Sequence, residues 1–367
     1  MTSKVTPPVR RVLFLIPTLT GGGSERVIVT LLTHLDRSRF KPSLAVVDLR
    51  GAVFRADIPP DVEVVDLEVT RVRYAVPAIV RLIRRMRPDV VLSTLGHLNL
   101  VLSIVRPLLP RGVRTIARES CVVSETLAYS RFPWLLSFLY RHFYRRHDLV
   151  VCQSKDMQDD LTINFGFPSD RSMLIHNPVD MEKVRQGALA PVDHPAFAAG
   201  ATVLLAAGRL EHQKGFDLLI EAMASLPDSR FELVILGEGP LEGDLRALAR
   251  KLGLEGRVHF AGFQKNPYAW ISKADAFVLS SRFEGFPNVV LEALACSTPV
   301  IATPAPGGVN ELLDGRPDCV VATAIDAPAL AKAIESWLRG PRRKVAADAA
   351  AAYSAARIVD RYEQILS

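Results

Sequence analysis

Cysteine is scarce in this 367-residue sequence, and the four cysteines lie far apart. They are Cys121, Cys152, Cys296 and Cys319, and no two of them form a Cys-x-x-Cys pair. Zinc sites and disulfide frameworks need more closely or more regularly spaced cysteines. The sequence therefore indicates neither, and a reducing cytosol suits it best.

Long apolar runs are also missing, because no stretch approaches the roughly 18 uninterrupted apolar residues of a membrane-spanning helix. The run from Val9 to Pro17 superficially resembles a signal peptide. However, Pro17 breaks it, and no small-residue cleavage site stands before Gly21. We interpret this run as the first buried strand and expect no segment to span a membrane.

Lysine is absent between Thr70 and His147, where the sequence has fourteen Arg and three acidic residues, a net charge of +11. The whole chain carries +6, so the remainder carries −5. Such a basic block favours an anionic partner, which could be a membrane surface, a diphosphate or, less readily, a nucleic acid.

What the sequence does contain is a repeated alternation of short apolar runs with helical patterns. The runs that we interpret as strands are 11–17, 43–47, 62–65, 90–92, 113–116, 149–152, 203–207, 232–236, 258–260, 276–279 and 300–301. Buried runs separated by helices predict parallel sheets covered on both faces. Since 367 residues exceed the size that one core usually serves, we expect two such domains.

Two glutamates frame one strand–loop–helix stretch. Glu284 follows the apolar run Ala276–Leu279, and Glu292 lies within a helical pattern that begins at Asn288. Both can face one crevice in front of the first-turn amides, which favour an anion, while carboxylates accept hydrogen bonds from hydroxyls. The stretch therefore predicts a site for a ligand with both hydroxyls and phosphates. The alternative is a packed corner with two solvated glutamates.

The full stretch, Arg282-Phe-Glu-Gly-Phe-Pro-Asn-Val-Val-Leu-Glu-Ala-Leu294, resembles the nucleotide-sugar signature of retaining glycosyltransferases of family 4. The resemblance implies the α/β class and the GT-B fold, in which two Rossmann-like domains face each other across a cleft. It implies an acceptor domain over residues 1–178 and a nucleotide-sugar domain over 179–349. The last helix of such proteins often crosses back, which we expect of residues 350–367, with the alanine-rich 346–356 favouring a helix.

Two cations, Arg209 and Lys214, stand in a turn before a predicted helix that begins at Phe216. Cations that converge at a helix N-terminus would clamp a diphosphate, with Arg supplying a fork of donors and Lys a mobile charge. The family has the same pair in a Gly-Arg-Leu…Gln-Lys-Gly motif, which favours a ligand role over simple solvation.

The glycine loop Gly21-Gly22-Gly23 follows the first strand and precedes a helix that we expect to begin near Ser24, a favourable N-cap. Its spacing fits neither the dinucleotide fingerprint nor a Walker loop. By the resemblance, Gly22 and Gly23 approach the donor diphosphate. On spacing alone, an ordinary loop is an equal alternative.

The resemblance also implies roles for the two glutamates. Glu292 would accept hydrogen bonds from the ribose hydroxyls. Glu284 would hold the donor sugar and take a catalytic part by helping to stabilise an oxocarbenium-like centre. Asn288 and Val289 would offer backbone N–H groups to the phosphates. The other donor-site positions that the resemblance implies are Phe286 and, in a loop that could equally be an ordinary turn, Gly262 and Phe263.

The acceptor side departs from the family pattern. Many family members carry a functional His after the strand that here ends in Ile116, but this sequence has Arg118-Glu119 at that place. Glu119, or His97 after the preceding strand, could act catalytically by orienting the acceptor hydroxyl or relaying its proton. Ordinary hydrogen-bonded loop residues are the alternative for both.

No Asp-x-Asp pair occurs, and such a pair is the usual way to bind a divalent ion that bridges two phosphates. We therefore expect no metal and no cofactor besides the nucleotide-diphosphate sugar as co-substrate. Arg209, Lys214 and helix dipoles would neutralise the leaving diphosphate instead.

An aromatic and basic stretch runs from Arg131 to His147, with Trp134 near its start and three arginines, Arg141, Arg145 and Arg146, near its end. It is too short to span a bilayer, but its composition suits the headgroup boundary. A core helix with cations at its C-terminus is the alternative. The Arg-only block favours docking on an anionic membrane surface, at the inner face of the cytoplasmic membrane.

Together these features predict a retaining glycosyltransferase that moves a sugar from a nucleotide-diphosphate donor, expected to be UDP-linked, to a lipid-linked glycan in bacterial polysaccharide or oligosaccharide assembly. The resemblance implies a front-face reaction, in which the departing phosphate helps to deprotonate the acceptor. The alternatives are a nucleotide-sugar 2-epimerase, a transferase with a soluble acceptor and a catalytically silent binding module. We expect no nucleic-acid partner, because the Arg block has no recognition motif.

Overall fold

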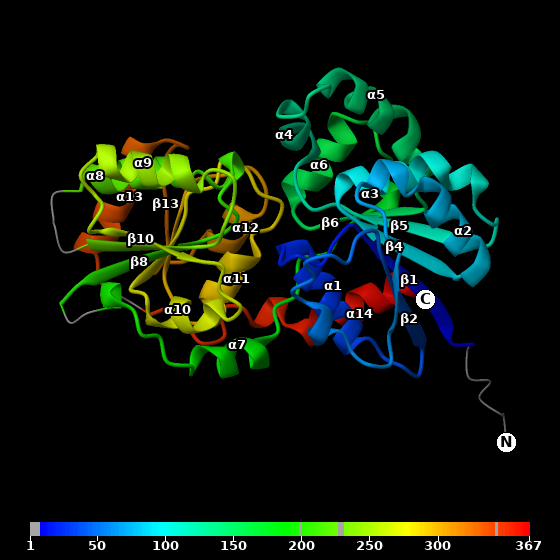
Figure 1. The fold of residues 1–367 in the computed structure, drawn as a ribbon, viewed down its shortest axis with the longest axis horizontal. Helices are drawn as coiled ribbons and strands as arrows, with labels where there is room; N and C mark the ends of the chain where they lie inside the picture. The colour runs from blue at the N-terminus through cyan, green and yellow to red at the C-terminus, as the bar shows by residue number, and fades with distance from the viewer. Residues whose placement is uncertain (1–7, 198–199, 227–230, 342–343) are drawn as a thin grey trace. The chain divides into compact units, whose positions relative to one another are not determined.

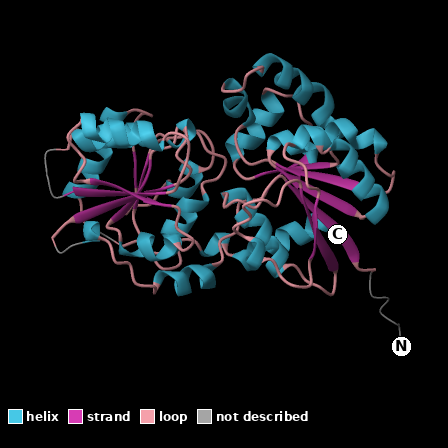
Figure 2. Ribbon diagram, viewed as in Figure 1, coloured by secondary structure: helices cyan, strands magenta, loops and turns pink. Residues whose placement is uncertain are grey.

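The computed structural model describes residues 8–197, 200–226, 231–341 and 344–367. The chain divides into two compact units (Figure 1). The first comprises the residues up to Pro178 together with Ala355–Ser367, and the second is Val179–Ser354. Each contains a parallel sheet with helices on both faces (Figure 2). The predicted α/β class with two Rossmann-like domains is therefore confirmed.

The sheet of the first unit has seven parallel strands in the order β3-β2-β1-β4-β5-β6-β7. They are β1 Arg10–Ile16, β2 Phe40–Val46, β3 Glu63–Asp66, β4 Val90–Thr94, β5 Arg114–Arg118, β6 Leu149–Cys152 and β7 Ser172–Leu174. Strand β1 is apolar on both sides, so Val12 and Phe14 enter one core and Leu13 and Leu15 another. The sequence did not predict β7, because three residues that begin with a serine form no apolar run.

Seven helices of the first unit lie within the described residues. They are α1 Gly23–His34, α2 Val76–Met86, α3 Gly96–Val105, α4 Val123–Ala128, α5 Pro133–Phe143, α6 Lys155–Ile163 and α14 Ala355–Leu366. Helices α1 and α14 share the core of Val12, and α2 and α3 share that of Leu13. We expected the alanine-rich residues 346–356 to be helical. However, α14 begins only at Ala355, and residues 346–350 are not helical.

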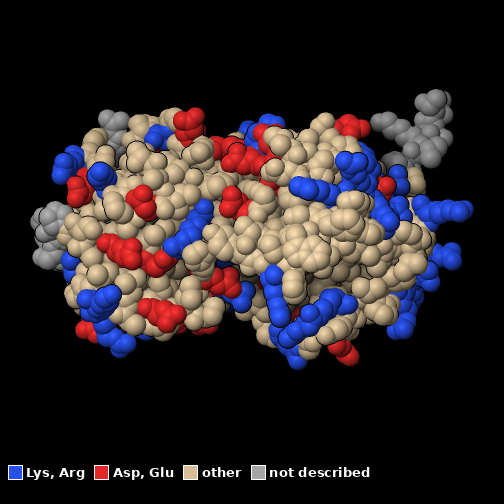
Figure 3. Space-filling view, turned by 90° about the horizontal axis from the view of Figure 1, so that it is seen from above, with Lys and Arg blue, Asp and Glu red and all other residues tan. Residues whose placement is uncertain are grey.

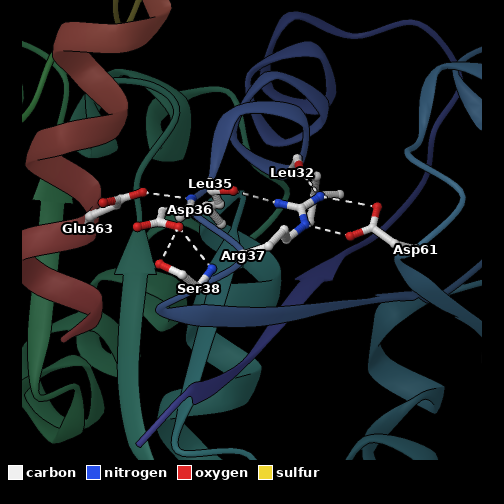
Figure 4. A network of polar contacts seen from close by, with 7 residues as sticks. All are labelled: Leu32, Leu35, Asp36, Arg37, Ser38, Asp61 and Glu363. Atoms are coloured by element: carbon white, nitrogen blue, oxygen red, sulfur yellow. Dashed lines mark hydrogen bonds and ion pairs between the residues drawn. The ribbon is translucent and has the colours of Figure 1, made fainter. Parts of the chain in front are cut away.

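The last helix, α14, joins the first unit through polar as well as apolar contacts. Glu363 accepts the backbone N–H of Asp36 at 2.8 Å, where α1 has just ended. Figure 4 shows this junction together with Arg37, whose Nε lies 2.5 Å from Asp61. The residues after the second unit therefore complete the fold of the first.

The sheet of the second unit has six parallel strands in the order β10-β9-β8-β11-β12-β13. They are β8 Thr202–Ala207, β9 Phe231–Leu236, β10 Val258–Gly262, β11 Ala276–Leu279, β12 Val300–Ala302 and β13 Val320–Val321. The sequence did not predict β13, whose two residues are too few for a recognisable run. The predicted strand 276–279 has the observed bounds of β11.

The helices of the second unit divide between the two faces of its sheet. They are α7 Met181–Ala188, α8 Phe216–Ala224, α9 Glu242–Lys251, α10 Pro267–Lys273, α11 Asn288–Ala295, α12 Val309–Leu313 and α13 Ala327–Arg339. Helices α8, α9 and α13 enclose one core, and α7, α10, α11 and α12 enclose the other. This arrangement directs the loops after β8 and β11 to one edge of the sheet.

Candidate functional site

The strand order of the second unit reverses between β8 and β11. These two strands pair directly, and the chain continues from β8 toward one edge of the sheet and from β11 toward the other. In open parallel sheets, ligands bind at such a switch point, beyond the carboxyl ends of the strands. The loops 208–215 and 280–287 contact each other there, which makes this edge the candidate site.

A buried ion pair lies at the centre of this edge. Lys214 Nζ is 2.6 Å from Glu284 Oε1, and the two side chains are 21% and 7% exposed. Ser281 donates a second hydrogen bond to the same carboxylate oxygen, at 2.6 Å. Because a buried charge is costly without such partners, these contacts fix the position of Glu284.

Two glycines allow the loops to approach each other this closely. Gly215, with φ +60, is the N-cap of α8, and a Cβ there would lie 2.1 Å from the carbonyl oxygen of Ser280. At Gly307, with φ +118, a Cβ would lie 2.4 Å from the carbonyl oxygen of Glu284. Both conditions, a positive φ and bare backbone, require glycine. Gly215 thereby sets the preceding Lys214 beside the loop after β11.

Arg282 links the loop after β11 to the loop after β8 and to the helix that follows it. Its guanidinium makes a two-pronged contact with Asp217 of α8, at 2.9 and 2.6 Å. Its backbone N–H donates to the carbonyl of Gln213 at 2.7 Å. Asp217 was not predicted from the sequence, although it is an acidic residue in the first turn of the helix that follows the Lys214 loop.

Arg209 occupies the rim of the site. Its side chain is 73% exposed, and its Nε lies 3.0 Å from Glu211. Arg209 and Lys214 thus hold different carboxylates, and the structure does not show the predicted convergence of the two cations on one point. The reason is local, because each cation pairs with the carboxylate nearest to it.

Glu292, Asn288 and Val289 all lie on α11. Asn288 and Val289 form its first turn, at the positive end of the helix dipole. Glu292 follows one turn later and is only 4% exposed. Glu284 is buried as well, so the alternative of two solvated glutamates is wrong.

The two phenylalanines that the resemblance placed at the donor site differ in their surroundings. The ring of Phe286 is buried and packs 5.6 Å from that of Tyr353. Phe263 is 38% exposed, and its backbone N–H lies 3.4 Å from Glu238. Gly262, with φ +67, turns the chain just before it. Of these two rings, that of Phe263 is the more exposed.

In the first unit, the glycine loop carries its own carboxylate. Glu25 accepts the backbone N–H groups of Gly21 and Gly22 at 2.8 and 3.0 Å, and the hydroxyl of Thr18 at 2.5 Å. Gly22, rather than Ser24, is therefore the N-cap of α1, and its backbone N–H donates to Glu25, which is the glutamate half of a capping box. The sequence analysis missed this contact, although a Glu three residues after an N-cap is a usual signal for it.

The two acceptor-side candidates lie in different surroundings. Glu119 is 3% exposed and accepts hydrogen bonds from Tyr144 and, at 3.3 Å, from Asn99. Burial raises the pKa of Glu119 to about 7. His97 lies in the first turn of α3, where part of its side chain reaches solvent while desolvation of the rest lowers the pKa of its imidazole. Glu119 is enclosed, whereas His97 has an exposed surface.

Neither a metal-ligating cluster nor a membrane span occurs in the described parts of the chain. No three His, Cys, Asp or Glu side chains among those residues are grouped so that they could hold a metal ion. None of the helices in the same ranges is both long and apolar enough to cross a bilayer.

Comparison with known proteins matches both halves of the chain to transferase families. The model described as Glycosyltransferase Family 4 matches residues 21–183, and that of Glycosyl transferases group 1 matches residues 193–354. A 4-alpha-N-acetylgalactosaminyltransferase of Campylobacter jejuni, named for its N-acetylgalactosamine-N,N'-diacetylbacillosaminyl-diphospho-undecaprenol substrate, is 31% identical over 309 residues, 81% of each chain. The lipopolysaccharide core biosynthesis glycosyltransferase LpsE of Rhizobium meliloti is 30% identical over 86% of this chain and 85% of its own.

Solved structures agree with these matches. Alr3699/HepE of Anabaena, in its complex with UDP-glucose, superposes with a TM-score of 0.79 over 97% of this chain and 99% of its own, at 20% identity. WaaG, a glycosyltransferase involved in lipopolysaccharide biosynthesis, superposes with a TM-score of 0.74 over 97% and 98%, at 19% identity. The chain therefore belongs to glycosyltransferase family 4 and is a glycosyltransferase with the GT-B fold.

Proposed function

We propose that this glycosyltransferase moves a sugar from a UDP-sugar to a lipid-linked glycan, with retention of configuration. The observation that carries the donor half of the proposal is the buried Lys214–Glu284 pair at the switch point of the second sheet. A relative of this fold has been solved with UDP-glucose, which supports a uridine donor.

Each donor group has a suitable partner at this edge. Lys214, with Arg209 swinging inward from the rim, would neutralise the diphosphate, as cations do for a leaving phosphate. Glu292 would bind the ribose hydroxyls, and Glu284 those of the sugar. The exposed ring of Phe263 would lie against the base. Glu284 then bridges the cation and the sugar, because it already holds Lys214 at 2.6 Å.

The proposed reaction occurs on one face of the sugar. The bond from the anomeric carbon to the diphosphate oxygen breaks, and the acceptor hydroxyl oxygen bonds to the same face of that carbon. The hydroxyl proton passes to the leaving phosphate oxygen, which Lys214 stabilises as its charge develops. We expect no metal requirement, so activity should persist in EDTA and should not rise with added Mg²⁺ or Mn²⁺.

The donor proposal is tested by screening nucleotide sugars by mass spectrometry, with and without a glycan-lipid acceptor. We expect one UDP-sugar to yield a product whose mass rises by one sugar, and only when acceptor is present. Epimerisation or hydrolysis of the donor alone, with no transfer, would support the 2-epimerase alternative instead.

The acceptor half of the proposal rests on the surface formed by α4, α5 and the turn between them. Trp134 is 71% exposed, Tyr129 60%, and Phe138 and Phe132 about half, which is unusual for large apolar side chains of a monomer. Arginines follow on the same stretch, and Figure 3 shows Lys and Arg atoms bordering uncharged surface on the first unit. Exposed aromatics beside arginines suit the headgroup boundary of a bilayer.

The arginines here also support the fold, because Arg141 and Arg146 donate to the backbone carbonyls of Asn164 and Ile104 at 3.1 Å. A carbonyl does not cancel their charge, which remains available to anionic lipid. The Campylobacter jejuni relative is named for an undecaprenol-linked substrate, and this supports a lipid-linked acceptor for the present chain.

Vesicle co-sedimentation tests the membrane part of the proposal. Replacing Trp134 and Phe138 by Ser, or Arg141, Arg145 and Arg146 by Gln, should weaken binding to anionic vesicles. A matched control replaces three exposed arginines of the second unit, Arg185, Arg246 and Arg339, by Gln, with the same change in net charge. If both arginine triples weakened binding equally, the docking surface would be wrong and only net charge would matter.

A further inference from the structure

Arg118, the last residue of β5, is the largest fully buried side chain of the described residues. Its guanidinium donates to the hydroxyl of Thr94 at 3.1 Å and to the side-chain oxygen of Asn177 at 2.5 Å. Both acceptors are neutral. A buried cation is ordinarily compensated by a carboxylate, so a guanidinium held by neutral groups points to a geometric task.

The surroundings of Arg118 identify the segments that it joins. Side chains alternate along a strand, so Arg118 points to the same face as Ile116, the face that α14 covers. There it lies beside Tyr362 of α14. Burial raises the pKa of Tyr362, and the adjacent Arg118 charge opposes that rise.

The chain passes between the units twice, and the contacts of Arg118 with Asn177 and Tyr362 lie near these two passages. Asn177 stands one residue before Pro178, where the first unit ends, and α14 begins at Ala355, where the chain returns. The passages also meet each other, because Val179 donates its backbone N–H to Tyr353 at 2.8 Å and bridges to Ser354. One guanidinium thus holds the residue before the first passage and touches the helix after the second.

We propose that Arg118 is a positioning residue that fixes the points from which both passages leave the first unit, and that it thereby limits the movement of the units during transfer. Arg suits this task because its planar fork donates in two fixed directions at once, which the single ammonium of Lys cannot do. The test of this proposal by kcat/KM rests on the proposed transferase function, whereas its test by the distances between the units does not.

The test compares Arg118→Gln with Arg114→Gln. Arg114 lies at the other end of the same strand and donates to the carbonyl of Ile365 of α14 at 2.5 Å, so it contacts the same helix at a different point. Both variants should unfold at lower temperature. Only Arg118→Gln should lower kcat/KM, by about tenfold, because it removes a charged hydrogen bond at the passage. UDP affinity should change less than about twofold in both, since the donor residues lie in the second unit.

Small-angle scattering with and without UDP-sugar gives the second readout, and only Arg118→Gln should broaden the distribution of distances between the units. Asn177→Ala removes the acceptor alone and should reproduce the kinetic loss even if Arg118→Gln fails to fold. In a double mutant, the two losses should not add. Equal kinetic losses in the Arg114 and Arg118 variants, or a normal kcat/KM in Asn177→Ala, would overturn the proposal. Absence of any transferase activity in the wild type would instead count against the proposed function, and scattering would still decide the role of Arg118.

Discussion

The two units share an architecture but use charged residues at the carboxyl ends of their strands differently. In the second unit, Lys214 and Glu284 come from separate loops and meet at the edge of the sheet. In the first unit, Glu25 caps its own glycine loop, while Arg118, the last residue of β5, and Glu119, which follows it, are both buried. Charge therefore forms a candidate ligand site in one unit and holds the fold together in the other.

A charged residue at the carboxyl end of a strand is therefore not identified as catalytic by its position alone. A carboxylate whose partner lies on another loop at a switch point, as for Glu284, is placed to be shared with a ligand. One whose partners belong to the same local unit, as for Glu25, already has its hydrogen bonds satisfied. Removing charges from each unit in turn tests this difference.

Lys214→Ala should have the largest effect. It removes the cation for the diphosphate and leaves Glu284 buried without its ion-pair partner, a loss of about 3–5 kcal/mol for buried pairs. We expect kcat/KM to fall at least about 100-fold and UDP binding, measured by calorimetry, to weaken strongly. Lys273→Ala, an exposed lysine of the same unit, is the matched control. Normal UDP affinity in Lys214→Ala would contradict the site.

Glu119→Gln should have the next largest effect, and it should act on stability. Burial raises the pKa of Glu119 from its ordinary 4.5 to about 7. The native state therefore binds the proton more tightly than the unfolded chain, and stability falls as pH rises between these two values. The neutral Gln should remove this slope and, above the higher value, stabilise the protein by up to about 3 kcal/mol.

Thermal unfolding from about pH 5 to about pH 8 measures the Glu119 effect. Glu125→Gln, at the first turn of α4, should leave the slope of the wild type unchanged. A Glu119→Gln protein that kept the wild-type slope would show that Glu119 does not titrate in this range.

Arg209→Ala should have a smaller effect than Lys214→Ala. Arg209 is exposed and pairs with Glu211 at the rim, so its loss creates no buried unpaired charge. We expect about a tenfold rise in the KM for the donor with little change in kcat, as for one lost charged hydrogen bond. Steady-state kinetics measure this, with the exposed Arg339→Ala as control. An effect as large as that of Lys214→Ala would mean that both cations meet at the diphosphate.

Glu363→Ala should have the smallest effect, in the first unit. It removes the acceptor of the Asp36 N–H and the ion pair with Arg39, at 2.8 and 2.7 Å, which we expect to cost about 1–2 kcal/mol. Urea unfolding measures the loss. Glu335→Ala, which loses only an exposed pair with Arg339, should stay within about 0.5 kcal/mol of the wild type. Equal losses would show that α14 is held by its apolar face alone.

Much of the fold could be predicted from the sequence, because the strands of both sheets are near-continuous apolar runs. β11 is the clearest case, with its bounds at Ala276 and Leu279. The edge strands β7 and β13 were missed, since two or three residues at an edge carry no apolar pattern. The start of α14 was placed too early, because alanine favours a helix but does not say where the chain crosses between units.

The donor edge could be predicted in part for a similar reason. Lys214, Glu284 and Glu292 stand in motifs whose spacing is set by the strand–loop–helix geometry. The supporting residues are less distinctive, because Ser281, which holds Glu284, and Asp217, which holds Arg282, show their importance only when the two loops contact each other. Burial of Glu119 could not be predicted, since it depends on Tyr144 and Asn99 from other elements.

The return of α14 to the first unit has a consequence for the order in which the protein is made. The twelve residues of α14 are synthesised after the whole second unit. Tyr362 and Leu366 of this helix are nevertheless buried in the same core as Val12 of β1. The face of the first sheet that α1 and α14 share therefore stays only partly covered while 176 residues, Val179–Ser354, are synthesised. The nascent chain is most open to aggregation and to chaperones during that interval, which ends when α14 emerges and packs.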